Sequence, residues 1–183
     1  MDEIFALVLP SSNFFSAMAN KFFRPLHRIF LLDAKLNSVL DESDPRGFCE
    51  AYFNELLEAI RMKRLAPLSV SPATDMEAPG FSAIQELTTS HTSFHYFWEP
   101  QVKGGNPNLH LDLYSCAPFD FGDILRVAHK HFGFSEWTAN FIDREIDPRK
   151  RLSLQIKGKG DQIVEQLVLT SGKEARTRVP VLA

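Results

Sequence analysis

The sequence predicts an α+β fold, a two-layer α/β sandwich with a mainly antiparallel sheet and helices on one face. Short apolar runs typical of strands recur along the chain, and two longer segments have the apolar spacing of amphipathic helices. Their order is strand, helix, several strands, helix and further strands, without the regular alternation of a parallel α/β fold. A Gly-Gly-Asn-Pro turn at 104–107 joins two of the strands, which predicts an antiparallel hairpin.

The first half of the chain predicts one strand, one helix and one loop. The run HRIFLLD, residues 27–33, is short and apolar, as in a buried strand. Asp44-Pro45 begins a helix, because proline suits the first helical position, and an apolar face continues from there to about residue 64. The basic residues between 61 and 64 then suit the end of the helix dipole. Residues 66–80 are rich in proline, so we expect a loop.

The second half of the chain predicts more strands and one helix. The helix spans 121–132, where apolar residues share one face and Gly133 suits the C-terminal cap. The last 30 or so residues include a hairpin that turns between 157 and 161. The remaining strands are expected over four ranges: 81–87, 93–98, 109–115 and 136–146.

Composition limits the classes of function. A chain of 183 residues that is 44% hydrophobic can bury a sizeable core. The net charge of -3 argues against nucleic acids and anionic membranes as partners, and no apolar run approaches the roughly 18 residues of a membrane span. We divide the chain into an N-terminal extension, 1–24, and a domain, 25–183. The acidic start Met1-Asp2-Glu3 is unlike a secretory signal.

Two cysteines, Cys49 and Cys116, are too few for a disulfide scaffold and form no zinc-binding pair, so we expect a cytoplasmic protein. The densest group of reactive side chains is TTSHTSFH, residues 88–95, with Cys116 following the next strand. This group is a candidate nucleophilic site, or else an ordinary polar turn beside a small buried thiol. His91 and His95 share a strand face, but no third ligand has suitable spacing, so we predict no metal.

The same residues carry a resemblance to a known family. The segment from Gly80 to His95 is similar to the core motif of prokaryotic S-adenosylmethionine decarboxylases, which are pyruvoyl enzymes made by self-cleavage. The resemblance extends from the strand at 27 to about residue 146, and the hairpin before the cysteine is longer here than in typical members. The matching positions, in order, are Gly80, Ser82, Ser90, His91, His95, Asp112 and Cys116.

The resemblance implies a self-processing proenzyme. Ser90 would attack the carbonyl of Thr89, and the chain would divide between residues 89 and 90. Ser90 would become the pyruvoyl cofactor, which binds the substrate amine as a Schiff base. His95 would assist the acid–base steps of processing, and Ser82 would hydrogen-bond the reacting ester. Cys116 would protonate the substrate carbon after carbon dioxide leaves.

The substrate implied by the resemblance is S-adenosylmethionine, decarboxylated to supply aminopropyl groups for spermidine. Phe97 is a candidate for stacking on the adenine. Glu99 is a candidate for binding the ribose hydroxyls, or else a solvated hairpin residue. Thr89 stands where the family commonly has Glu. Family enzymes of this size also imply a homodimer of cleaved protomers, with active sites at or near the interface.

Three alternatives remain open at the level of sequence. The same machinery would suit another amino acid, such as ornithine or arginine, because each offers an α-amino carboxylate. A catalytically dead relative would act instead as a regulatory or binding subunit. Finally, the motif would be a coincidence in an unrelated α+β domain.

Overall fold

The computed structural model describes residues 27–74, 79–98, 105–144, 151–170 and 177–178. The predicted extension at 1–24 and the predicted ribose-binding Glu99 lie outside these residues. The described elements, in chain order, are β1 (Arg28–Leu36), α2 (Pro45–Ala59), β2 (Ser69–Ala73), β3 (Gly80–Leu87), β4 (Ser90–Phe97), β5 (Asn108–Ser115), α3 (Phe121–Phe132), β6 (Phe134–Asp143), β7 (Leu152–Lys159), β8 (Gln162–Thr170) and β9 (Thr177–Arg178).

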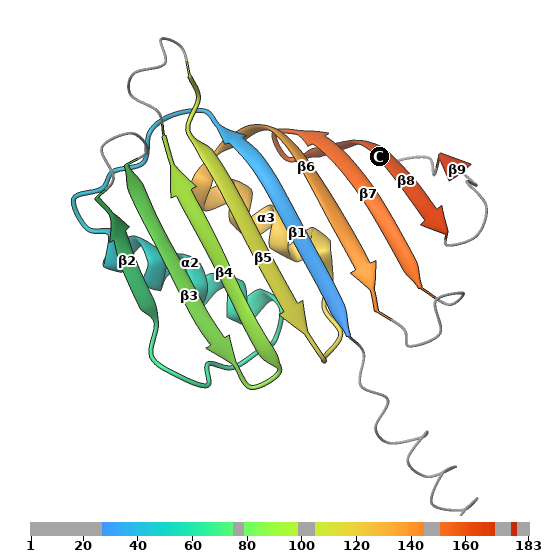
Figure 1. Ribbon diagram of the computed structural model, residues 1–183, viewed down its shortest axis with the longest axis horizontal. Coiled ribbons are helices and arrows are strands. Elements are labelled where there is room, and N and C mark those ends of the chain that lie inside the picture. The colour runs from blue at the N-terminus through green and yellow to red at the C-terminus, as the bar shows by residue number, and fades with distance from the viewer. Residues whose placement is uncertain (1–26, 75–78, 99–104, 145–150, 171–176, 179–183) are drawn as a thin grey trace, which may run out of the picture.

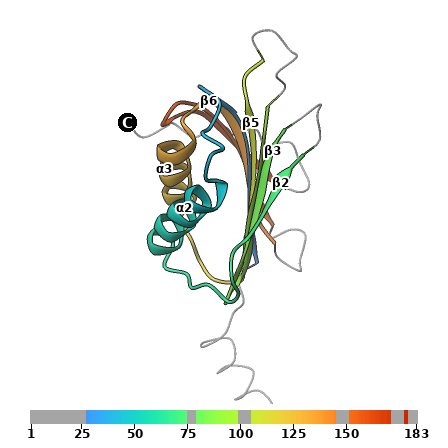
Figure 2. The same cartoon turned by 90° about the vertical axis from the view of Figure 1, so that its left-hand side faces the viewer.

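The strands form one sheet in the order β2-β3-β4-β5-β1-β6-β7-β8-β9 (Figure 1). Every neighbouring pair among the described strands is antiparallel. The first described strand, β1, lies in the middle of the sheet, between β5 and β6. Both described helices cover the same face, and they leave the opposite face open (Figure 2). The predicted α+β two-layer sandwich is therefore confirmed.

The two helices begin and end where the sequence supplies caps. Asp44 accepts a hydrogen bond from the backbone N–H of Gly47 at the start of α2, and Asp120 does the same for Gly122 in α3. Gly133 ends α3 in the left-handed conformation, with φ of 61°, as predicted. Neither described helix is long and apolar enough to cross a membrane.

The end of the first helix was predicted wrongly. The helix stops at Ala59, because Arg61 adopts a left-handed φ of 56° and the chain leaves the helix axis. The chain then runs beside the end of the sheet, where Leu65 donates its backbone N–H to Glu86. The basic residues between 61 and 64 therefore follow the helix instead of forming its last turn.

The predicted loop at 66–80 also contains a strand. Residues Ser69–Ala73 pair with β3 at one edge of the sheet. Pro72 lies within this strand, and an edge position tolerates proline because only one side of the strand has a partner. The prediction failed because proline content outweighed a short strand signal.

The core fills the space between the sheet and the helices and is rich in aromatic rings. Phe94 on β4 is fully buried and contacts the rings of Tyr52, Phe53, Phe81 and Phe132. These rings come from both helices and from the neighbouring strand. The high phenylalanine content of the sequence thus supplies the contact between the two layers.

Candidate active site

The tight turn between β3 and β4 holds the candidate cleavage site. The predicted polar turn is shorter than expected, because β4 begins at Ser90 and only Thr88 and Thr89 remain in the turn. Ser90 is paired with Ser115 at the end of β5, so Cys116 lies directly beside the turn. We refer to Thr89, Ser90 and Cys116 as the turn cluster.

Ser90 has an unusual backbone conformation. Its φ is 152°, a positive value that favours glycine and costs a residue with a side chain about 1–3 kcal/mol. The carbonyl oxygen of Thr89, immediately before it, accepts a hydrogen bond from the backbone N–H of Cys116 (3.0 Å). The peptide bond between residues 89 and 90 is thus both strained on one side and hydrogen-bonded at its carbonyl.

Imidazole and phenol groups lie beside this turn. The hydroxyl of Ser90 is 3.3 Å from Nδ1 of His91. The ring of His91 contacts Tyr114 with ring centroids 5.8 Å apart, and the hydroxyl of Tyr114 hydrogen-bonds Nδ1 of His27 (2.6 Å). His27 and Tyr114 were not singled out from the sequence, because they meet only when β1 and β5 pair.

The two cysteines have opposite surroundings. Cys116 is a free, exposed thiol beside the turn. Cys49 is buried in α2, and this burial raises the pKa of its thiol to about 12. The structure therefore leaves Cys116 as the accessible thiol of the pair.

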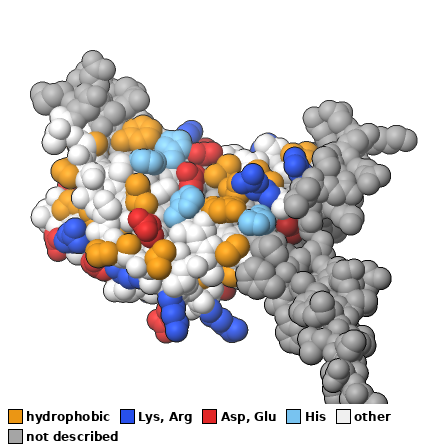
Figure 3. All heavy atoms as spheres, turned by 60° about the horizontal axis from the view of Figure 1, so that its bottom comes forward, with side chains coloured by type: hydrophobic (Ala, Val, Ile, Leu, Met, Phe, Trp, Pro, Cys, Tyr) orange, Lys and Arg blue, Asp and Glu red, His pale blue; other side chains and the backbone are white. Residues whose placement is uncertain are grey.

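A second polar group crosses the middle of the open face. Ser82, His95, His110 and Asp33 lie directly opposite one another on β3, β4, β5 and β1. The hydroxyl of Ser82 is 2.7 Å from Nδ1 of His95, and Asp33 hydrogen-bonds Nδ1 of His110 (2.5 Å). We refer to these four residues as the polar row. Histidine side chains lie among hydrophobic and acidic ones on this face (Figure 3).

The close approach of β3 to β4 explains why the motif has a glycine at position 80. Gly80 has a positive φ of 156°, and a Cβ there would lie 2.1 Å from the carbonyl oxygen of Tyr96. Only glycine fits this close approach of β3 to β4. The close pairing then sets the register that brings Ser82 opposite His95.

A single chain does not bring all the predicted site residues together. Ser90 and His95 lie five residues apart on the same strand, a separation of about 16 Å at a rise of about 3.3 Å per residue. Ser90 and Cys116 belong to the turn cluster at the end of the sheet, while Ser82 and His95 belong to the polar row. Phe97, the predicted adenine platform, stacks on His110 with centroids 5.4 Å apart.

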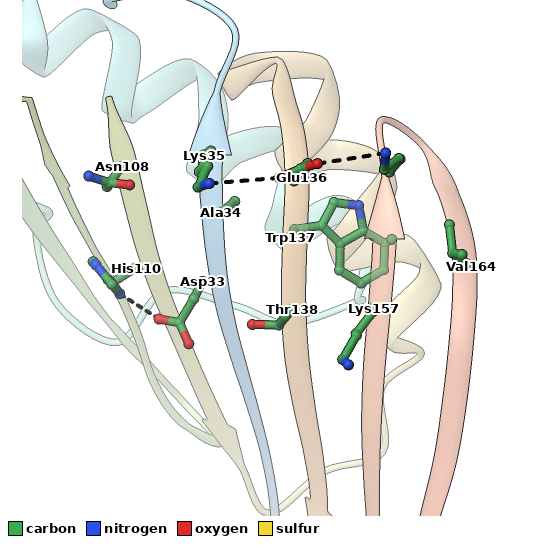
Figure 4. A pocket seen from close by; sticks show the side chains of 12 residues that line it. Asp33, Ala34, Lys35, Asn108, His110, Glu136, Trp137, Thr138, Lys157 and Val164 are labelled. Atoms are coloured by element: carbon green, nitrogen blue, oxygen red, sulfur yellow. Dashed lines mark hydrogen bonds and ion pairs between the residues drawn. The ribbon is translucent and has the colours of Figure 1, made fainter. Parts of the chain in front are cut away.

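A shallow pocket of about 540 Å³ adjoins the far end of the polar row (Figure 4). Asp33 and His110 form one wall, and Glu136 bridges Lys35 and Lys159 on the other. Alternation of polar residues in each strand could have suggested this surface, but the sequence does not give the pairing of β1 with β5 and β6. Among the described residues, no three histidine, cysteine or acidic side chains lie close enough to share a metal ion.

Comparison with known families identifies the class of this antiparallel α+β sandwich. The model of the S-adenosylmethionine decarboxylase family matches residues 40–145, more than half of the chain. The chain therefore belongs to the S-adenosylmethionine decarboxylase family, a family of decarboxylases. No curated protein matches the chain.

Proposed function

We propose that this chain is a self-cleaving, pyruvoyl-dependent decarboxylase that acts on S-adenosyl-L-methionine and supplies aminopropyl groups for spermidine. The observation that carries the proposal is the strained Ser90, which follows a carbonyl already held by a hydrogen bond. This arrangement lies within the residues that match the family. The exposed, free Cys116 thiol also fits a reducing cytoplasm.

Self-cleavage begins with attack of the Ser90 hydroxyl oxygen on the carbonyl carbon of Thr89. The C–N bond breaks as the C–O bond forms, which leaves an ester and a free amine on residue 90. Removal of the α-proton of residue 90 then expels the Thr89 carboxylate and splits the chain. The resulting dehydroalanine tautomerises to an imine, and water replaces the nitrogen, which leaves as ammonia.

The residues of the turn cluster suit the first of these steps. Negative charge develops on the carbonyl oxygen of Thr89 during the attack, and the backbone N–H of Cys116 is aimed at that oxygen. A donor already in place costs no reorganisation when the charge appears. The strain at Ser90 is also relieved once the peptide bond is lost, so it favours cleavage.

The second half of the reaction needs a proton donor near residue 90. A pyruvoyl group there supplies a carbonyl that accepts the electron pair released when carbon dioxide leaves. Cys116 lies next to the turn and is exposed, so its thiol is our candidate for protonating the substrate carbon. Phe97 remains our candidate for the adenine, and Glu99 for the ribose.

We propose that the active unit is a homodimer whose sites use residues of both chains. The support is the separation of about 16 Å between Ser90 and His95 within one strand, which is too long for proton transfer. Ser82 and His95 lie on the sheet face that no described helix covers (Figure 2). A second copy on this face would bring its own Ser90 to the polar row of the first.

Release of carbon dioxide tests the proposed substrate. Purified protein is incubated with carboxyl-labelled S-adenosylmethionine, ornithine or arginine, and the released label is counted. We expect label only from S-adenosylmethionine, and none from Ser90→Ala protein. Release of label from ornithine or arginine would support the proposed decarboxylation mechanism but with a different substrate. No release from a cleaved wild-type chain with any of the three would reject the proposed activity.

A further inference from the structure

One histidine of the sequence motif has no part in the reaction described so far. His91 follows Ser90 directly, and its Nδ1 is 3.3 Å from the hydroxyl oxygen of Ser90. Among the described residues, no other side chain lies within hydrogen-bond distance of that oxygen. The Ser90 hydroxyl must lose its proton when it attacks the carbonyl of Thr89, and the His91 ring is the group beside it.

The ring of His91 lies against a neighbour that is itself fixed. Tyr114 is directly opposite His91 on β5, and the two ring centroids are 5.8 Å apart. The hydroxyl of Tyr114 hydrogen-bonds Nδ1 of His27 (2.6 Å), and these two rings stack with an interplanar angle of 13°. The backbone carbonyl of His27 accepts a hydrogen bond from the N–H of Arg144. Tyr114 therefore forms a wall that limits the movement of the His91 ring.

The other candidate bases do not reach the Ser90 hydroxyl. Glu86 is opposite His91 on β3, and Asp112 is one diagonal position from His91 on β5. Within the described ranges, neither carboxylate hydrogen-bonds the hydroxyl of Ser90. His95 lies about 16 Å from Ser90 in the same chain. Within one chain, the base in contact with Ser90 is therefore the imidazole of His91.

We propose that His91 is a catalytic residue of the first cleavage step and acts within its own chain. With its own proton on Nε2, the ring takes the proton of the Ser90 hydroxyl at Nδ1 as the C–O bond to Thr89 forms. The ring then gives this proton to the nitrogen of residue 90 as the C–N bond breaks, so it ends the step unchanged. The proposal rests on the self-cleavage proposed above. It leaves His95 of a second chain for the later removal of the α-proton.

One imidazole can serve both reacting atoms. The hydroxyl oxygen and the nitrogen belong to the same residue and are separated only by Cα and Cβ, so a ring beside one atom is close to the other. Imidazole side chains exchange protons near neutral pH. The distance of 3.3 Å is slightly longer than a catalytic hydrogen bond, and such contacts commonly tighten as the reaction begins.

Trapping of the ester tests this proposal. Hydroxylamine splits an ester between residues 89 and 90 but leaves the peptide bond intact, and the new fragment begins with a free serine amine instead of a pyruvoyl group. Full-length His95→Gln chain is made by cell-free translation, because its reaction should stop at the ester. In excess hydroxylamine we expect this chain to split, and the additional change His91→Ala to slow the splitting about 10²-fold. Mass spectrometry identifies the fragments.

Three further measurements in the same background separate proton transfer from a structural role. Added imidazole should restore most of the rate lost in His91→Ala, because it can occupy the space left by the ring. His91→Asn keeps a hydrogen-bonding atom near the position of Nδ1 but cannot carry the proton, so it should stay slow. Ser93→Ala changes the next residue on the same face of β4 and should leave the rate unchanged.

The outcomes distinguish the role of His91 from self-cleavage itself. Equal rates with and without His91, a full rate for His91→Asn, or no response of His91→Ala to imidazole would each overturn the proposal and leave self-cleavage standing. A wild-type chain that forms the ester through His91 but never splits without hydroxylamine would reject the proposed function alone. A wild-type chain that neither splits nor yields the ester would reject both.

Discussion

The backbone N–H of Cys116 donates a hydrogen bond to the carbonyl oxygen of Thr89, at 3.0 Å. The contact joins the end of β5 to the turn before β4, and it spans 27 positions from residue 89 to residue 116. It gives Cys116 a role for its backbone in addition to the role proposed for its thiol. Replacement of the side chain should therefore spare cleavage, because the backbone donor remains.

The strain at Ser90 predicts a difference between two uncleavable variants. Glycine adopts a positive φ without penalty, whereas alanine keeps the strain of serine. We expect Ser90→Gly protein to exceed Ser90→Ala protein in free energy of unfolding by about 1 kcal/mol or more, measured by urea denaturation. Equal stabilities, or a more stable alanine variant, would show that the backbone conformation at residue 90 is not strained.

The two thiols predict selective alkylation. Iodoacetamide should label Cys116 in the native protein and leave Cys49 unlabelled, because Cys49 is buried and its pKa is raised to about 12. Cys116→Ala should still be cleaved but lose decarboxylase turnover by about 10²-fold or more, the contribution of a general acid. Mass spectrometry of labelled peptides and label release from the substrate measure the two effects. If Cys116→Ala protein kept wild-type turnover, another group would have to be the proton donor.

A site shared between chains predicts complementation. Ser90→Ala and His95→Gln chains, each expressed alone, should cleave slowly or not at all. When they are coexpressed with different tags, the His95→Gln chain should be cleaved, because it retains Ser90 and meets His95 of the other chain. The Ser90→Ala chain should stay intact in the same sample. Absence of cleavage in mixed dimers isolated through both tags would contradict the shared site.

Burial of Tyr96 predicts a loss of stability at alkaline pH. Burial raises the pKa of Tyr96 to about 12, above the value near 10 of an unfolded tyrosine. The phenol therefore stays protonated in the folded state while the unfolded state ionises, and its contribution to stability, fully present below pH 10, is lost between pH 10 and pH 12. The loss amounts to about 2 kcal/mol by linkage.

Tyr96→Phe provides the matched comparison for this effect. The variant loses the acceptor of the Leu40 backbone N–H and should be less stable than wild type at pH 8. Above pH 10 its free energy of unfolding should fall less steeply than that of wild type, so the two curves converge. Parallel curves across this range would exclude Tyr96 as a source of the alkaline loss.

Local patterns in the sequence predicted most elements of the fold. The caps at Asp44 and Gly133 and the apolar spacing of the helices depend on neighbouring residues only, and the helix at 121–132 was predicted to the residue. The edge strand at 69–73 was missed, because its pairing with β3 overrides a proline-rich local signal. The early end of α2 was also missed, because no local pattern marks the left-handed φ at Arg61, after which Leu65 bonds to Glu86 of the sheet.

The candidate site was only partly predictable. Ser82, Ser90, His95 and Cys116 were identified through resemblance to a family, and their roles remain predictions. The split between turn cluster and polar row depends on strand register, which pairs Asp33 of β1 with His110 of β5 across 77 positions of the sequence. Asp33 and His110 meet only through that pairing, so no local pattern could have joined them.

The intact mass of freshly purified protein under denaturing conditions shows whether the chain cleaves itself between Thr89 and Ser90. We expect two fragments, one ending at Thr89 and one beginning with a pyruvoyl group at position 90. The Ser90→Ala variant should give a single full-length mass in the same experiment. A single full-length mass for the wild-type chain, unchanged over days at neutral pH, would contradict self-cleavage and favour a regulatory or binding role for this family member.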